Sequence, residues 1–314
     1  MYMLYIYLFY VYIFKLKIHK MSSLEINYEN FEWKKYLKIN KDLLIDGILN
    51  KELAWNHWIN FGNKECRPVS LTNNSCIHNG RFGNLFFINM AVHFICLKNK
   101  LKFNYKYYDE FKSLGIDLFI GNQTFSESIT LTDDNFLHII INNNEYKNII
   151  INNEVWCQSS NFCIFLKEYF SLEKIKGKIM KKNKFKERYD NNNDLFLHVR
   201  LGDIENTKSS HYNYYNTVLK NISFNKGYIS SDTIESKLCK KIIKKYNLKI
   251  IDYNEVETIM FASTCSNIVL SGGTFSWLIG FLAYYSKKIY YPKDKKNKWY
   301  GDIFIFSDWI GISE

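Results

Sequence analysis

The chain has 314 residues, of which 47% are hydrophobic and 23% are charged, and this balance excludes an intrinsically disordered protein. Its formal net charge of +11 is carried by scattered lysines with no arginine-rich stretch, which argues against a nucleic-acid-binding protein. The seven cysteines form no C-x-x-C pair and no zinc-type Cys/His spacing. We therefore expect reduced, buried thiols in a cytoplasmic protein.

Residues 1–27 form an N-terminal extension that begins with an apolar and aromatic run over 1–14. The run is shorter than the roughly 20 apolar residues that a membrane-spanning helix needs. Its positive charges follow the run, whereas those of a signal peptide precede it. We expect no membrane span here, and membrane association through residues 1–14 is the alternative that we do not favour.

Residues 28–70 form a separate small module. Apolar side chains recur at helical spacing over 31–44 and again over 53–61, and Gly47 and Gly62 follow the two stretches. The spacing predicts a helical hairpin. His57 and Trp58 could hold a ligand, but packing in the core of the module is the favoured interpretation.

Residues 71–190 begin an alternating α/β pattern and are expected to form a first lobe. Most of this lobe is rich in Asn and gives weak patterns. The expected elements are a helix over 85–97, strands over 101–105, 136–141 and 147–152, and a helix over 162–170.

Residues 191–314 show the alternation clearly and are expected to form a second lobe. Strand and helix follow each other at a tempo that predicts a parallel sheet with crossover helices. The expected strands cover 194–200, 227–232, 249–252, 267–271 and 288–291, and the expected helices cover 234–246, 255–265 and 275–285. In such sheets ligands bind outside the carboxyl ends of the strands.

The strongest motif is H-V-R-L-G-D over residues 198–203, at the end of an expected strand. Arg200 would present a planar fork that matches phosphate oxygens, and Gly202 would let the backbone approach a ligand closely. Asp203 could orient that arginine or accept a proton. A surface turn with a salt bridge is the alternative interpretation.

A second motif, S-G-G-T-F-S-W over residues 271–277, lies between an apolar strand and an apolar helix. The N–H groups at such a helix start suit an anionic phosphate. We therefore predict phosphate contacts from Gly273, Thr274, Phe275 and Ser276, with the hydroxyls as added donors. Trp277 is expected to pack in the core, and core packing is also an alternative for Phe275.

Two further groups complete the candidate site. Asp232 ends an expected strand, where it could contact a base or a ribose or instead cap a helix. Gly80, Gly83 and Asn84 precede an apolar helix, and such a loop suits a phosphate-bearing group, although G-x-x-G alone is a common pattern.

In their order and spacing these motifs resemble the α-1,2-fucosyltransferases of glycosyltransferase family 11. The family signature H-x-R-x-G-D is complete at 198–203, and its G-x-L-G-N-Q-M-F loop is similar to residues 80–86, with Leu85 and Phe86 in place of Gln and Met. Its S-D-D and S-x-S-S/T-F-S-W segments resemble 231–233 and 271–277, with Thr233 and two glycines as departures. The similarity covers about residues 77–310, and residues 28–68 are similar to small modules beside glycosyltransferase domains in some viral and bacterial proteins.

The resemblance implies an α/β, GT-B-like architecture with two Rossmann-like lobes that face a cleft, 71–190 on the acceptor side and 191–314 on the GDP-sugar side. It also implies GDP-fucose or another GDP-hexose as donor, a glycan hydroxyl as acceptor, inverting transfer, and no metal or other cofactor. The sequence agrees that no D-x-D motif ends a strand. Arg200 would stabilise the departing diphosphate, and Asp203 and His198 are both candidates for the base. The alternative is a non-catalytic carbohydrate- or partner-binding protein that retains the fold.

Overall fold

The structure of the protein, a computed structural model, describes residues 28–29, 31, 33–62, 80–125, 127–142, 147–190, 192–202, 212–293 and 302–313. The chain divides into two compact units, each described by itself below. The first is Met1–Asn79, Ile88–Lys106 and Leu118–Cys157, and the second is Gly80–Phe87, Tyr107–Asp117 and Gln158–Glu314. The lobe bounds expected from the sequence stay a prediction, and residues 1–27 lie outside the described residues.

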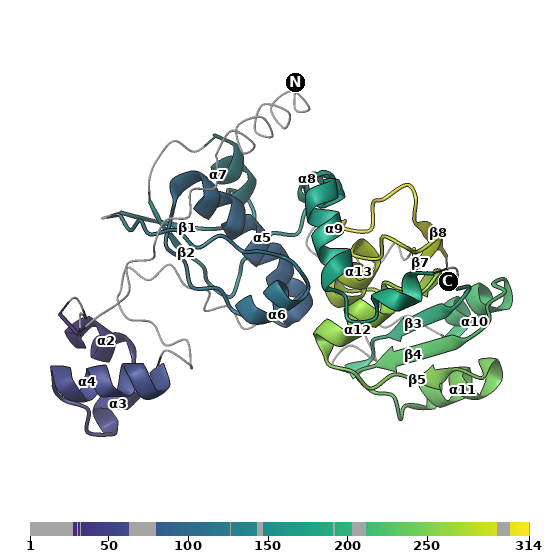
Figure 1. The fold of residues 1–314 in the computed structure, drawn as a ribbon, viewed down its shortest axis with the longest axis horizontal. Helices are drawn as coiled ribbons and strands as arrows, with labels where there is room; N and C mark the ends of the chain where they lie inside the picture. The colour runs from purple at the N-terminus through teal and green to yellow at the C-terminus, as the bar shows by residue number, and fades with distance from the viewer. Residues whose placement is uncertain are drawn as a thin grey trace. The chain divides into compact units, whose positions relative to one another are not determined.

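The N-terminal part of the first unit contains short helices (Figure 1). They are α2 (Trp33–Ile39), α3 (Asp42–Ile45), α4 (Lys51–His57) and a π-helical turn, η1 (Trp58–Gly62). Asn50 caps α4 by accepting a hydrogen bond from the Leu53 N–H. The Tyr36 hydroxyl lies 2.8 Å from Nδ1 of His57, and Trp58 is buried, so both His57 and Trp58 take part in the packing of this segment.

The rest of the first unit has a small parallel pair of strands, β1 (Ser128–Thr130) and β2 (Asn148–Ile150). Strand β2 confirms the strand expected over 147–152. The strand expected over 101–105 is wrong, because the residues described there form isolated bridges and no strand, and one bridge joins Leu101 to Gln123.

The strand expected over 136–141 is also wrong, because this segment forms helix α7 (Phe136–Asn142). Thr132 and Asn135 cap its start reciprocally. The Thr132 N–H donates to Oδ1 of Asn135 at 2.8 Å, and the Asn135 N–H donates to Oγ1 of Thr132 at 3.2 Å. This local exchange starts a helix in a stretch whose β-branched residues alone favour a strand.

The second unit follows the alternation expected from the sequence. Helix α5 (Phe82–Asn99) contributes its first residues to this unit. The other elements are α6 (Tyr108–Ser113), α8 (Ser160–Ser171), α9 (Glu173–Lys182), a 3-10 turn η2 (Lys186–Tyr189), β3 (Leu195–Val199), α10 (Tyr212–Lys220), β4 (Gly227–Ser231), α11 (Lys237–Tyr246), β5 (Lys249–Ile250), α12 (Glu255–Ala262), β6 (Asn267–Val269), α13 (Thr274–Phe281), β7 (Lys288–Pro292) and β8 (Ile310–Ile312).

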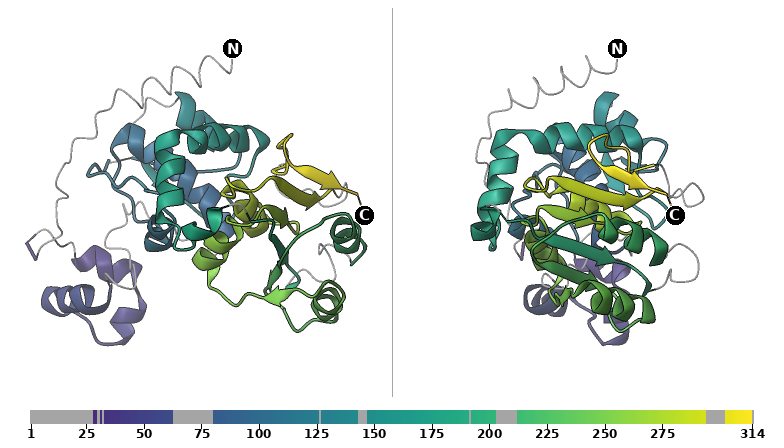
Figure 2. Two further views of the ribbon diagram at one scale, coloured as in Figure 1. Left: turned by 45° about the vertical axis from the view of Figure 1, so that its right-hand side comes forward. Right: turned by 90° about the vertical axis from the view of Figure 1, so that its right-hand side faces the viewer.

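The six strands of the second unit form one sheet in the order β5-β4-β3-β6-β7-β8 (Figures 1 and 2). Every neighbouring pair is parallel, and Leu197 of β3 lies beside Ile229 of β4 and Val269 of β6. Renumbered by chain order this is 3-2-1-4-5-6, the strand order of Rossmann-like sheets. The expected parallel α/β architecture is therefore confirmed for this unit.

Residues of β3 alternate between two helical layers because successive side chains of a strand point to opposite faces. Leu195, Leu197 and Val199 pack in a core that includes residues of α10 and α11. On the other face, Phe196 contacts Phe261 of α12, and His198 contacts α13. All residues of β3 are buried, as expected for a central parallel strand.

Helix α13 is held in place by aromatic packing. Trp277 is fully buried, stacks on Phe281 with 4.5 Å between ring centroids, and contacts Phe87 at 4.8 Å. Its indole N–H donates to the Ile303 carbonyl at 2.7 Å. The prediction that Trp277 packs in the core is confirmed.

Five cysteines fall among the described residues, and all are buried free thiols, namely Cys96, Cys157, Cys163, Cys239 and Cys265. Burial raises the pKa of Cys96 and of Cys265 to about 12, so both stay protonated at neutral pH. Cys66 and Cys76 lie outside the described residues. No helix within the described ranges combines the length and the apolar character needed to cross a membrane.

The start of α12 provides a test of the helical layer. Asn254 accepts a hydrogen bond from the Glu257 N–H at 2.9 Å, in an N-x-x-E pattern typical of a helix start. We expect Asn254→Ala to lower the free energy of unfolding by about 0.5–2 kcal/mol, measured by urea denaturation. Asn254→Ser keeps the acceptor and should remain near wild type. Equal losses in both variants would contradict a capping role.

Candidate functional site

The strand order of the second unit reverses between β3 and β6, which are neighbours in the sheet although not in sequence. In open parallel sheets the carboxyl ends of the strands at such a switch point form the usual ligand site. Arg200 follows β3 directly, and Ser271 follows β6 by two residues. The two strongest sequence motifs therefore meet at the switch point.

A buried polar cluster joins the two motifs. Nδ1 of His198 lies 2.7 Å from Oγ of Ser276 and 3.3 Å from Oγ of Ser271. The Ser271 N–H donates to Oγ of Ser276 at 2.9 Å, and the two hydroxyl oxygens are also 2.9 Å apart. The cluster ties β3, the segment after β6 and the first turn of α13 together.

His198 is neutral in this environment. Burial lowers its pKa from the usual value near 6.5 to about 4, while the Asp232 charge acts in the opposite direction and Arg200 lowers it further. The ring also meets Phe275 edge-on, with 5.3 Å between centroids. His198 can exchange hydrogen bonds at neutral pH but carries no charge there.

Arg200 lies against the residue that precedes α13. A Cβ built on Gly273 would be 3.6 Å from Cδ of Arg200, and Gly273 has a φ of +124°, which side chains of L residues rarely adopt. The N-cap residue of α13 is Gly273, which has no side chain to cap the helix. The Arg200 side chain and the start of this helix are thus neighbours.

The sequence placed Gly83 and Asn84 in a loop, but both lie in the first turn of α5, which belongs to the same unit and packs on the start of α13. A Cβ on Gly83 would lie 2.7 Å from both Cα of Phe275 and the carbonyl carbon of Thr274, so only glycine fits. Oδ1 of Asn84 accepts hydrogen bonds from the Thr274 hydroxyl at 2.7 Å and from Nε2 of Gln158 at 3.2 Å. The structure therefore brings the start of α5, with Gly83 and Asn84, to the switch point.

Asp232 organises the segment that leaves β3. Its Oδ1 accepts a hydrogen bond from the Leu201 N–H at 2.9 Å, and the Gly202 N–H donates to Oγ1 of Thr233 at 3.3 Å. Oδ2 lies 3.8 Å from Nη1 of Arg81, an exposed pair that adds little stability. Helix α11 is capped by Ser236, so Asp232 is not its N-cap residue.

The predicted site residues thus gather in one place, with one exception: Asp203 lies outside the described residues. The sequence did not reveal that the hydroxyls of Thr274 and Ser276 bond to Asn84 and His198 inside the protein. It also missed Ser271 as a partner of His198, although Ser271 stands in the recognised motif.

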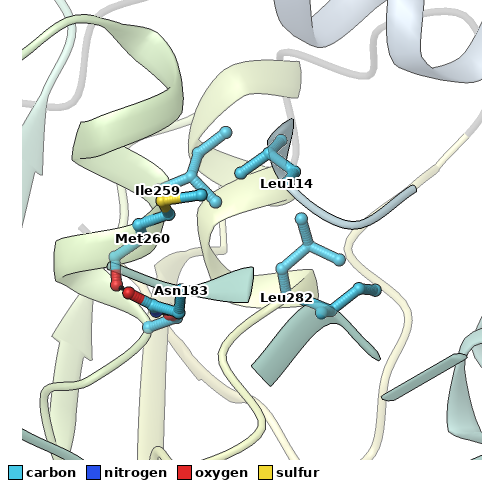
Figure 3. Close-up of a pocket in the computed structure, with 7 residues that line it drawn as sticks. Leu114, Asn183, Ile259, Met260 and Leu282 are labelled. Carbon is cyan, nitrogen blue, oxygen red and sulfur yellow. Dashed lines mark hydrogen bonds between the residues drawn. The ribbon is translucent and has the colours of Figure 1, made fainter. Parts of the chain in front are cut away.

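A small pocket elsewhere in the second unit is not suited to a nucleotide (Figure 3). Its lining is mostly apolar, with Leu114, Ile259, Met260 and Leu282, and it includes no charged side chain that could bind a phosphate. Its polar residues are already bonded, since Asn183 donates to the Met260 carbonyl and to Oγ of Ser263.

Within the described ranges, no three His, Cys, Asp or Glu side chains come together in a group that could hold a metal ion. Comparison of the chain with protein-family models, curated proteins and solved structures found no match.

The close contact between Gly83 and α13 can be tested by a matched pair of substitutions. Gly83→Ala forces a methyl group into the α13 backbone, and we expect a loss of about 1–3 kcal/mol in the free energy of unfolding. A Cβ on Gly272 meets nothing within 4 Å, so Gly272→Ala should change stability by less than about 0.5 kcal/mol. Urea denaturation measures both, and a Gly83→Ala variant as stable as Gly272→Ala would contradict the close packing.

The neutral state of His198 predicts a pH dependence of stability. Since its pKa falls to about 4 on folding, the unfolded chain binds more protons between that value and the unfolded pKa near 6.5. Stability therefore falls on acidification through this window, by on the order of 2 kcal/mol between about pH 7.5 and about pH 5. The His198→Asn variant lacks the titrating ring, so its loss of stability between the two pH values should be smaller than that of the wild type by this amount. Urea denaturation at both pH values measures the two losses. An identical loss in both proteins would contradict the prediction.

Proposed function

We propose that the chain is an inverting glycosyltransferase that moves fucose or a related hexose from a GDP-sugar to a hydroxyl of a glycan acceptor. The observation that carries the proposal is the proximity of Arg200 to the uncapped start of α13 at the switch point of a parallel sheet. The finer architecture of the α-1,2-fucosyltransferases, a GT-B fold preceded by a helical hairpin, is part of this proposal.

Both groups suit a diphosphate. A guanidinium offers a planar pair of N–H donors to phosphate oxygens, and the first N–H groups of α13 add donors and a favourable helix dipole. Packing brings them together, since Gly273 lies near Cδ of Arg200 and Gly83 lies against the first turn of α13. Such preorganised donors stabilise charge without reorganising during the reaction.

The proposed reaction breaks the bond between C1 of the sugar and the β-phosphate oxygen of the donor. The acceptor hydroxyl forms a new bond to C1 from the opposite face, and its proton passes to a base. The electron pair of the broken bond stays on the diphosphate, where Arg200 and the α13 N–H groups would stabilise the added charge. The sequence analysis gives His198 and Asp203 as candidates for the base that accepts this proton.

The remaining polar groups would orient the donor. Asp232 follows β4, the strand next to β3, and Oδ1 already holds the Leu201 N–H. We assign its partly exposed Oδ2 to the ribose or the base. Gly83 and Asn84 lie in the first turn of α5, which packs on α13, and this turn would border the phosphate site together with Gly80 just before it.

A non-catalytic binding protein is the second candidate, and the segment of short helices favours it. Large apolar side chains are exposed there, among them Ile45, Leu49 and Phe61 at 88%, 65% and 57%. Exposed apolar groups of this kind suit a protein partner. This candidate requires partner or glycan binding without GDP binding.

Transfer from GDP-fucose, measured against a panel of sugar acceptors, tests the proposal. We expect Arg200→Ala to reduce turnover on the order of a hundredfold or more, because the diphosphate loses a preorganised donor. Arg200→Lys keeps the positive charge but loses the planar pair of N–H donors, so its turnover should lie between that of the wild type and that of Arg200→Ala. Lys244→Ala on the exposed side of α11 removes one positive charge away from the switch point and should behave as wild type.

Calorimetry with GDP and UDP separates the candidates. Binding of GDP that is weakened by Arg200→Ala supports the glycosyltransferase. No GDP binding, together with retained glycan or protein binding, would favour the binding protein. Transfer from UDP-sugars alone would overturn the donor assignment.

A further inference from the structure

The hydrogen bonds around His198 bear on which ring nitrogen carries the proton. Nδ1 is the nitrogen that faces the serine pair, 2.7 Å from Oγ of Ser276 and 3.3 Å from Oγ of Ser271. Ser271 and Ser276 are each 1% exposed and His198 is 6% exposed, so water contributes little to this cluster. The protons that lie between the ring and the two serines must therefore find acceptors among these groups.

In the Nε2–H tautomer, every proton between the ring and the two serines has an acceptor. The Ser271 N–H and the Ser271 hydroxyl both donate to Oγ of Ser276, which fills its two lone pairs. The Ser276 hydroxyl then donates to Nδ1 of His198 at 2.7 Å. Nδ1 is the acceptor in this arrangement, so the proton of the neutral ring lies on Nε2.

The opposite tautomer leaves one proton without an acceptor. If Nδ1–H donates to Oγ of Ser276, the Ser276 hydroxyl must turn to Oγ of Ser271. Among the described residues, the Ser271 hydroxyl then has no acceptor. A buried donor without a partner disfavours this tautomer by a factor of roughly 5 to 150 in population.

We propose that Ser276 and Ser271 are positioning residues that hold His198 as the Nε2–H tautomer, so that it donates a hydrogen bond to the diphosphate of the sugar donor instead of acting as the base. The identity of this ligand rests on the proposed function. The tautomer itself rests on the hydrogen bonds alone.

The surroundings of the ring agree with this role. Nε2 makes no hydrogen bond to any residue in the described part of the chain, and it is not one of the fully buried polar atoms without a partner there, so its proton can reach solvent or a ligand. The charged groups that act on the ring are Asp232 at the end of β4 and Arg200 after β3, and Phe275 covers one edge. With Nδ1 bonded to Ser276 and Nε2 protonated, the ring has no free lone pair for the proton of the acceptor hydroxyl. Asp203 is then the remaining candidate for the base.

Nitrogen NMR on the full-length, histidine-labelled protein tests the tautomer without any activity. The chain has seven histidines, so the His198 signals are assigned by their absence in His198→Asn. We expect a neutral ring at neutral pH with the proton on Nε2. A proton on Nδ1, or a doubly protonated ring, would overturn the proposal.

Two serine variants test the cause. Ser271→Ala retains the bond between Ser276 and Nδ1 and should keep the tautomer. The double variant Ser271→Ala/Ser276→Ala removes both hydroxyls, and the Nε2–H population relative to Nδ1–H should fall at least about fivefold. An unchanged ratio in the double variant would show that the serines do not set the tautomer. If the double variant does not fold, the wild-type and Ser271→Ala spectra still decide the proposal.

Addition of GDP separates this proposal from the proposed function. A shift of the Nε2–H resonance on binding supports the role as donor. An Nε2–H ring whose signal does not move while GDP binds would overturn that role and leave the nucleotide assignment intact. An Nε2–H ring with no GDP binding at all would overturn the proposed function and leave the positioning role of the serines standing.

Discussion

The hydrogen bond between His198 and Ser276 is the contact on which the candidate site depends. It connects the central strand of the sheet to the first turn of α13, across the point where the strand order reverses. Parallel strands on the two sides of such a point send their connections away from each other, which leaves the ends of β3 and β6 side by side. The buried bond fixes the start of α13 beside β3, and Arg200 follows two residues after His198 in the chain.

The cluster is polar and buried, and it carries no charge. A charged imidazole there would have to be desolvated beside Arg200, and the low pKa of His198 reflects that cost. Neutral hydrogen bonds avoid it, provided that every donor has an acceptor, because a half-satisfied polar network is less stable than an apolar one. This requirement favours the ring tautomer whose proton lies on Nε2, away from the serine pair.

The sequence predicted the second unit well and the first unit poorly, for physical reasons. Strands β3 and β6 are buried on both faces, so they appear as largely apolar runs with a glycine close behind each of them. The segment over 136–142 is also apolar, and it is a helix whose start is capped by Thr132 and Asn135. The packing of Gly83 on Phe275 joins residues far apart in the chain, and no local pattern encodes such a contact. The motifs predicted which residues gather, but the hydrogen-bond partners of their hydroxyls depend on tertiary geometry.

The geometry of the site indicates what Gly272 and Gly273 do at the start of α13. The resembling family carries larger residues there, whereas here a Cβ on Gly272 would meet open space, and Gly273 adopts a φ of +124°. The nearby hydroxyls are occupied, since Thr274 bonds to Asn84 and Ser276 bonds to His198 and Ser271. Recognition of an anion at this helix start would therefore fall to backbone N–H groups and to the guanidinium of Arg200. In the proposed function, bare backbone and the guanidinium of Arg200 would select for the charge and the shape of a diphosphate. The choice of sugar and base would then come from side chains farther along the donor, with Asp232 as one of them.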